Sequence, residues 1–179
     1  MRGCMRSIVT SGVMALVLAA AMAAVPAHAQ GRFDEYQVKA AFLFNFVKFT
    51  QWPPSDYRSD AVVIGVVGRG PFYTALEGLV KGQKLNGREV VVREVMDAED
   101  LRTYHIILIA ESEARRAADI LQRVKGAGVL TVGETPYFLR EGGLVRFYVE
   151  ANRIRFQIDP AGAQQAGLKI NSQLLSLAR

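Results

Sequence analysis

Cysteine and histidine are almost absent from this chain. Its 179 residues include one cysteine, Cys4, and two histidines, His28 and His105. Only His105 lies outside the first 29 residues, which carry the features of a removable segment. Without that segment, the chain cannot build a Cys/His zinc site, a three-histidine zinc centre or a Cys–His nucleophile. The composition therefore predicts a protein that is not an enzyme and that uses no metal or cofactor.

The first 29 residues have the pattern of a secretory signal peptide. Arg2 and Arg6 form a basic start, residues 8–25 are almost all apolar, and Ala27-His28-Ala29 has small residues at both ends. This A-x-A triplet predicts cleavage after Ala29 and a location in the periplasm. The apolar run is close to the length of a membrane span, so an uncleaved anchor is the alternative. The polar residues that follow Ala29 favour cleavage.

Strong charge of one sign is also missing. The signal segment holds two of the 22 basic residues and none of the 17 acidic ones, so cleavage lowers the net charge from +5 to +3. No long run of lysine and arginine is present. This mild charge argues against nucleic acid as a partner.

Residues 30–179 alternate between apolar strands and amphipathic helices. Short apolar runs such as AVVIGVV at 61–67 are typical of strands buried on both faces. Strands are predicted at 61–67, 89–95, 105–110, 129–132, 144–150 and 153–158, and helices at 34–51, 72–80, 97–102, 113–125 and from 159 to the C-terminus. The last two strands flank Ala151-Asn152 as a hairpin. We expect one α/β domain: a mixed, mostly parallel sheet of about six strands, with helices on both faces and a C-terminal β-hairpin.

The first predicted helix carries an aromatic stripe. Val38, Phe42, Phe46 and Phe49 are spaced to lie on one side of it, and Leu43 and Val47 widen the stripe. Such a stripe must be covered, either by the domain's own sheet or in part by a partner.

Residues with chemical potential are few. His105 starts an apolar strand, where we expect it to make a structural hydrogen bond. The loop Gly68-Arg69-Gly70 lies between a strand and a helix, where backbone N–H groups can approach an anion or small ligand. It does not match a dinucleotide or P-loop motif, and a tight turn before Pro71 is the alternative. The acids Asp97, Glu99 and Asp100 are expected to be solvated surface.

The C-terminal hairpin offers a candidate binding surface. Alternation places several arginines and a tyrosine on one side of the two strands. Arginine and tyrosine are favoured at protein interfaces, although an ordinary polar sheet face is the alternative. The predicted partner-binding residues, with the loop before the hairpin, are Tyr137, Phe138, Arg146, Tyr148, Glu150, Arg153 and Arg155.

Several motifs together resemble the YfiR family of periplasmic proteins. They are EYQVKAAFLFNF at 35–46, KF at 48–49 with WP at 52–53, GVVG at 65–68 with PF at 71–72, LTVG at 130–133, GG at 142–143 leading into RIRFQI at 153–158, and AGLKINSQLL at 166–175. Their order and spacing carry the resemblance over nearly all of residues 30–179.

The resemblance implies a regulatory binding protein without a cofactor. Proteins similar to YfiR repress an inner-membrane diguanylate cyclase by binding its periplasmic sensor region, and so lower cyclic-di-GMP output and biofilm formation. An outer-membrane lipoprotein can sequester them, and they tend to form homodimers. The best-known member has disulfides tied to a redox response. This chain has no cysteine after residue 29, so redox control is not expected.

A second interpretation stays open from the residues alone. An α/β sheet with a crevice at the carboxyl ends of its strands suits a periplasmic small-ligand receptor or transport accessory protein. The neighbouring genes would separate the two interpretations, because a cyclase with a periplasmic domain favours the first.

Overall fold

The computed structural model describes residues 27–53, 60–68, 70–97 and 100–178, and side chains from residue 35 onward. By its internal contacts the chain divides into residues 1–32 and 33–179, and the fold below belongs to the second unit. The predicted signal peptide lies outside the described residues up to residue 26. The predicted cleavage site at Ala29 falls within the first described helix, α2 (Ala27–Phe49).

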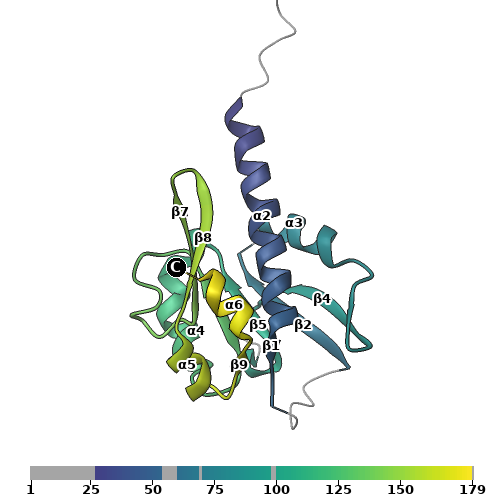
Figure 1. Ribbon diagram of the computed structural model, residues 1–179, viewed down its shortest axis with the longest axis vertical. Helices are drawn as coiled ribbons and strands as arrows, with labels where there is room; N and C mark the ends of the chain where they lie inside the picture. Colours follow the sequence, from purple (N-terminus) through teal and green to yellow (C-terminus); the bar gives the residue numbers. More distant parts are fainter. Residues whose placement is uncertain (1–26, 54–59, 69, 98–99, 179) are drawn as a thin grey trace, which may run out of the picture. The chain divides into compact units, whose positions relative to one another are not determined.

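A seven-stranded mixed sheet forms the centre of residues 33–179. Its strand order is β3-β4-β2-β5-β6-β7-β8, with the β7–β8 pair at one edge (Figure 1). Strands β4, β2, β5, β6 and β7 run parallel, and β3 and β8 are antiparallel to their neighbours. The strands are β2 (Ala61–Val67), β3 (Lys84–Leu85), β4 (Arg88–Glu94), β5 (Ile106–Ile109), β6 (Leu130–Gly133), β7 (Val145–Glu150) and β8 (Arg153–Ile158). The six predicted strands and the mixed α/β class are confirmed, and β3 is an addition.

Helices cover both faces of this sheet, because the parallel strands are apolar on both sides. In β2, Val62, Ile64 and Val66 belong to one buried cluster, whereas Val63 and Val67 belong to another. Successive strand residues point to opposite faces, so the two clusters lie on opposite sides. The first includes α2 and α3 (Pro71–Val80), and the second includes η2 (Leu101–Thr103) and α4 (Ala117–Arg123).

The aromatic helix α2 packs on the domain's own sheet. Phe46 is fully buried and contacts Phe147 and Phe156 of the β7–β8 hairpin, with ring centroids 5.5 and 5.1 Å apart. Phe42 also contacts Phe156, at 5.3 Å. The predicted stripe is wrong at Val38, which is 44% exposed. Leu43 and Val47, which were predicted to widen the stripe, are fully buried.

The C-terminal region is more broken than the single helical stretch that we predicted. It contains α5 (Pro160–Gln165), β9 (Lys169–Ile170) and α6 (Ser172–Leu177). Strand β9 pairs with β1 (Thr50–Gln51), directly after α2, and so joins the two ends of the domain. Two-residue strands have no periodicity that a sequence could reveal. Within the described residues, no helix combines the length and apolar character that a bilayer crossing needs.

Candidate functional site

The carboxyl ends of β2, β5 and β6 form the sheet edge where α/β proteins usually bind ligands. The strand order reverses between β2 and β5, which makes this a topological switch point. Here Lys39 of α2, although only 6% exposed, forms ion pairs with Glu35 of the same helix and with Glu134 after β6. The backbone N–H of Glu111, after β5, donates to the second oxygen of Glu134 at 3.2 Å. Charged side chains therefore fill this edge and tie α2 to the sheet.

The ion pairs determine the charge state of Lys39. Burial by itself opposes the ammonium charge, but the hydrogen bonds to Glu134 and Glu35 outweigh it and raise the pKa of Lys39 above its usual 10.5. The lysine is thus a fixed cation held between two carboxylates. It is not an accessible base, and its charge is not free to hold an anion.

The loop Gly68-Arg69-Gly70, predicted as an anion or small-ligand site, has an acidic side chain packed against it. Gly68 adopts φ +94°, which suits glycine, and a Cβ at this position would lie 2.7 Å from Cγ of Glu113. The acidic side chain of Glu113 therefore packs against the loop, where it would repel an anion. Arg69 lies outside the described residues, and Gly70 precedes α3 without a side-chain cap.

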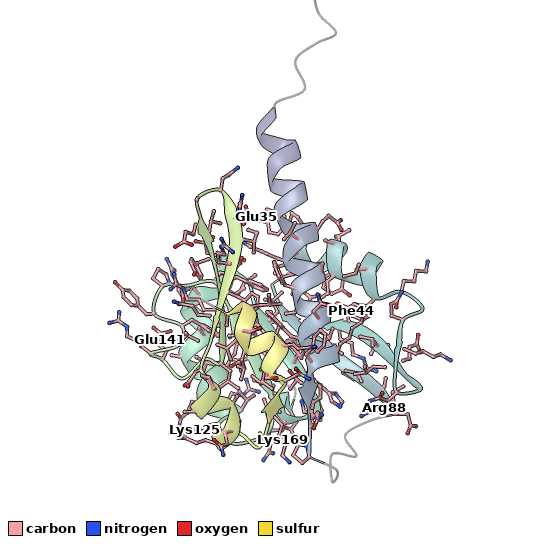
Figure 2. The ribbon with its side chains drawn as sticks, in the orientation of Figure 1. Glu35, Phe44, Arg88, Lys125, Glu141 and Lys169 are labelled. Atoms are coloured by element: carbon pink, nitrogen blue, oxygen red, sulfur yellow. The ribbon has the colours of Figure 1, made fainter. Side chains whose placement is uncertain are left out.

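His105 has a structural environment at the opposite end of the sheet. It is completely buried, and its Nδ1 accepts a hydrogen bond from the N–H of Val63 at 3.1 Å. Nε2 lies 3.0 Å from Nη2 of Arg88, and the imidazole meets the edge of Trp52. Figure 2 shows Arg88 and Glu35 near opposite ends of the sheet. The predicted structural hydrogen bond is present, with further contacts that the sequence did not indicate.

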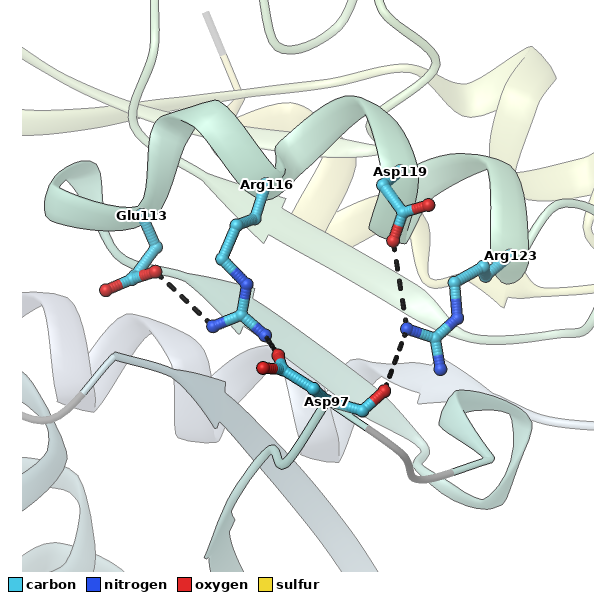
Figure 3. A network of polar contacts seen from close by, with 5 residues as sticks. All are labelled: Asp97, Glu113, Arg116, Asp119 and Arg123. Carbon is cyan, nitrogen blue, oxygen red and sulfur yellow. Dashed lines mark hydrogen bonds and ion pairs between the residues drawn. The ribbon is translucent and has the colours of Figure 1, made fainter.

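The acidic residues after β4 form surface ion pairs. Asp97 forms an ion pair with Arg116 of η3 (Glu111–Arg116), and Arg116 also pairs with Glu113 at 3.3 Å. Arg123 pairs with Asp119 and donates to the carbonyl of Asp97 (Figure 3). Hydrogen bonds from Arg102 lower the pKa of the Asp100 carboxyl. Glu99 lies outside the described residues. Among the described side chains, no group of three metal-binding residues occurs.

A cavity of about 610 Å³ lies between α4 and α5. Lys125, Thr131, Glu141 and Gln165 are among its polar lining residues, and Figure 2 marks Lys125 and Glu141. Lys125 and Thr131 place it toward the amino ends of β6 and β7. This is not the carboxyl edge that the small-ligand interpretation would use.

The β7–β8 register brings the predicted hairpin residues together. Arg146 faces Gln157, Tyr148 faces Arg155, and Glu150 faces Arg153 across the two strands. Directly opposed residues in an antiparallel pair share one side of the sheet. These six residues form one surface, the hairpin face, which lies opposite the side on which Phe147 and Phe156 pack against α2.

The hairpin face carries three arginines against one glutamate. Arg146 donates from Nη1 to Oε1 of Gln157 at 3.2 Å and lies over the ring of Tyr148. Arg155 pairs with Glu150 at 3.8 Å. Within the described residues, the buried Nε atoms of Arg146 and Arg155 have no hydrogen-bond acceptor. Contacts within the protein therefore do not satisfy all the donors on this face.

The two remaining candidate residues, in the loop before the hairpin, differ in exposure. Tyr137 is 57% exposed and stacks with the guanidinium of Arg140, 4.3 Å from the ring centroid. Phe138 is only 1% exposed and belongs to the second buried cluster. The prediction that Phe138 lies on the binding surface is wrong, because its ring packs against Gly133 and Gly143 in the interior. Arg140 was not predicted as a binding residue. Its position three residues after Tyr137 could have indicated the contact between the two side chains.

Comparisons with known proteins show first what the fold resembles. The comparison with curated proteins finds no match. The crystal structure of a conserved domain protein from Vibrio cholerae O1 biovar El Tor str. N16961 matches with a TM-score of 0.51 and 12% sequence identity. The match covers 80% of this chain and only 58% of that chain. At this identity the likeness shows a shared fold alone.

The family comparison covers most of the chain. The model of the family described as YfiR/HmsC-like matches residues 36–179, from within α2 to the C-terminus. This span includes the buried helix, the sheet and the hairpin face, and it confirms the resemblance drawn from the motifs. The chain belongs to the YfiR/HmsC-like family.

Proposed function

We propose that this protein is a periplasmic regulator that represses an inner-membrane diguanylate cyclase by binding the cyclase's periplasmic sensor region. The family match over residues 36–179 is the observation that carries this proposal. The hairpin face supports binding as the mode of action, because arginine and tyrosine favour protein interfaces. The binding residues are Tyr137, Arg146, Tyr148, Glu150, Arg153 and Arg155, joined by Arg140.

The regulation works as a population shift. A protein that binds the inactive sensor more tightly than the active one moves the cyclase toward its inactive state. A competing partner, such as an outer-membrane lipoprotein, relieves repression by holding the regulator away from the cyclase. A homodimer of the regulator would present two hairpin faces.

The protein acts without catalysis in this proposal. His105 is fully buried, and its ring contacts Val63, Arg88 and Trp52. Lys39 is a cation neutralised by two carboxylates. These two side chains are thus engaged in holding the fold.

Deletion and complementation in the source bacterium test the proposal. We expect the deletion to raise cyclic-di-GMP several-fold and the wild-type gene to restore the original level. Arg153→Glu reverses an exposed charge of the hairpin face and should fail to restore it. Arg93→Glu reverses an exposed charge on β4, which lies toward the other edge of the sheet from β8. This variant should restore the original cyclic-di-GMP level fully.

Immunoblots of periplasmic fractions must show equal amounts of each variant. The mature protein should begin at Gln30 by mass spectrometry. An unchanged cyclic-di-GMP level after deletion contradicts the proposed regulation. Full repression by Arg153→Glu contradicts the hairpin face as the binding surface.

The cavity between α4 and α5 supports a second candidate, a periplasmic small-ligand receptor. Its volume of about 610 Å³ lies within the usual range for ligand pockets. Thermal unfolding in the presence of phosphates, nucleotides and amino acids tests this function. A rise in Tm that is abolished by Gln122→Ala, a change in the cavity lining, supports it, and an unchanged Tm with all of these ligands rejects it.

A further inference from the structure

Strand β8 is the outermost strand at its edge of the sheet. It pairs with β7 over all six of its residues, and no described strand pairs with its other side. An edge strand of this length displays a row of backbone donors and acceptors, which is a template for another strand. The opposite edge is shielded in part, because β3 pairs with the start of β4.

The hairpin turn determines which backbone groups face outward. Ala151 and Asn152 have φ values of 47° and 58°, as a two-residue type I′ turn requires. The flanking residues Glu150 and Arg153 then exchange hydrogen bonds, and every second pair along the ladder does the same. Arg153, Arg155 and Gln157 therefore bond to β7, whereas Ile154 and Phe156 direct their N–H and C=O groups to the open edge.

An added strand would meet two different surfaces. On one side its residues would lie beside Arg153 and Arg155 of the hairpin face. On the other side they would lie beside Ile154, which is half-buried and apolar. Neighbouring strands contact each other through side chains on the same face. A complementary strand therefore alternates acidic with apolar residues.

Two central registers of self-pairing with a second copy of this chain are unfavourable. In antiparallel self-pairing centred on residue 154, Arg153 would face Arg155 of the other copy, and centring on residue 155 would place Arg155 against itself. Like charges directly opposite each other destabilise a sheet. Arginines on an edge strand are also a common device against self-association.

We propose that β8 accepts an extended segment of the regulated partner, with alternating acidic and apolar residues, as an eighth strand of the sheet. The inference rests on the proposed function and specifies how its binding surface works. Backbone hydrogen bonds to Ile154 and Phe156 supply the docking geometry, and the arginines select acidic side chains. This is the strand-addition mode of peptide recognition.

A synthetic peptide of alternating glutamate and valine is the probe, with an alternating lysine and valine peptide as its control. Amide hydrogen exchange by NMR measures the edge directly. In the free protein, the amides of Arg153, Arg155 and Gln157 should exchange slowly and that of Ile154 rapidly. The acidic peptide should slow exchange at Ile154, and the basic peptide should not.

Two variants separate backbone pairing from side-chain contacts. Ile154→Pro removes an outward N–H while leaving the bonds to β7 intact, and Ile154→Ala removes the side chain but keeps the N–H. We expect Ile154→Pro to weaken binding of the acidic peptide at least tenfold relative to Ile154→Ala. Arg155→Glu should weaken it similarly, and Arg93→Glu should not.

Equal binding by Ile154→Pro and Ile154→Ala would overturn strand addition, as would equal binding of the two peptides. A concentration-dependent dimer that Ile154→Pro dissociates would assign the edge to a second copy and also overturn it. The complementation assay keeps the two proposals distinct. If Arg153→Glu abolishes repression but Ile154→Pro does not, the hairpin face remains the binding surface and only strand addition fails.

Discussion

At the scale of single residues, the ring of Phe138 anchors the loop that presents Tyr137 and Arg140. The ring lies between Gly133 at the end of β6 and Gly143 before β7, and both glycines are buried. A Cβ on Gly143 would lie 2.2 Å from the ring and 2.8 Å from the Phe138 carbonyl. The loop conformation therefore depends on the absence of side chains at two positions.

Gly143→Ala tests this dependence. The methyl group must displace both the Phe138 ring and its backbone, and overpacking of this kind costs about 1–3 kcal/mol. We expect the free energy of unfolding, measured with urea, to fall by that amount. Binding through Tyr137 should weaken as the loop shifts.

Gly78→Ala is the matched control. Gly78 lies within α3, and a Cβ there meets nothing within 4 Å. Alanine is a better helix former by about 1 kcal/mol, so this variant should be more stable than the wild type. A stable Gly143→Ala protein would show that Phe138 does not hold the loop in this way.

At the scale of elements, the ion pairs of Lys39 fasten α2 to the end of β6. The Lys39 side chain is 8% exposed and that of Glu134 is 11% exposed. Removing one partner of a buried pair leaves the other charged without compensation. The contact thus reinforces the aromatic packing that already holds α2 on the sheet.

Lys39→Met should lower the free energy of unfolding by about 3 kcal/mol, because it leaves the nearly buried Glu134 carboxylate without its cation. Lys48→Met removes the same charge from an exposed position of the same helix. We expect that control to change stability by no more than about 0.5 kcal/mol. Equal effects of the two substitutions in chemical denaturation would contradict the role of the buried pair.

The stabilisation by Lys39 should also depend on pH. Its pKa is raised in the folded protein, so folding favours the protonated lysine, and the stabilisation is fully present below the ordinary pKa of 10.5. It is lost as the pH rises above 10.5 through the folded-state value. The stability difference between wild type and Lys39→Met should therefore be constant near neutral pH and shrink in strong alkali. A difference that shrinks between neutral pH and pH 10.5 would contradict this assignment.

At the scale of the whole molecule, stability comes from two apolar clusters on either side of one sheet. Phe46 and Phe147 lie in the first, and Ile107 and Phe138 lie in the second. No cysteine follows residue 29 in the sequence, so disulfides cannot contribute after cleavage. A domain of this size can bury enough apolar surface to fold without them.

Reducing agent should therefore leave the stability of the cleaved protein unchanged. We expect the same Tm with and without dithiothreitol, and the same hairpin-dependent repression under oxidising and reducing conditions. Differential scanning calorimetry provides the measurement. Because Cys4 is the one cysteine of the sequence, a Tm that falls on reduction would mean that uncleaved copies are joined by a Cys4–Cys4 disulfide, and so that the predicted cleavage does not occur.

Local patterns predicted much of this fold. Apolar runs such as 61–67 located the parallel strands, because burial on both faces requires continuous apolar sequence. Period-two alternation located β7 and β8 and correctly placed Arg146, Tyr148 and Arg155 on one side. The turn at Ala151-Asn152 was predicted as well, although neither residue is glycine.

Patterns were less informative where a residue's environment comes from distant parts of the chain. Phe138 lies in a polar loop, and only the packing of two glycines around its ring shows that it is buried. No pattern in the sequence indicated that Lys39 is buried, because a charged side chain is buried only when partners are supplied, here Glu35 and the distant Glu134.

The sequence by itself determined the class of fold, the two-sided sheet, the hairpin and the scarcity of catalytic side chains, since these depend on composition and local periodicity. The tertiary structure alone decided that Lys39 is buried, that β9 pairs with β1, and that β8 forms an open edge. The reason is physical. Periodicity specifies how each segment divides between apolar and polar sides, but strand order and long-range partners depend on how the segments pack together.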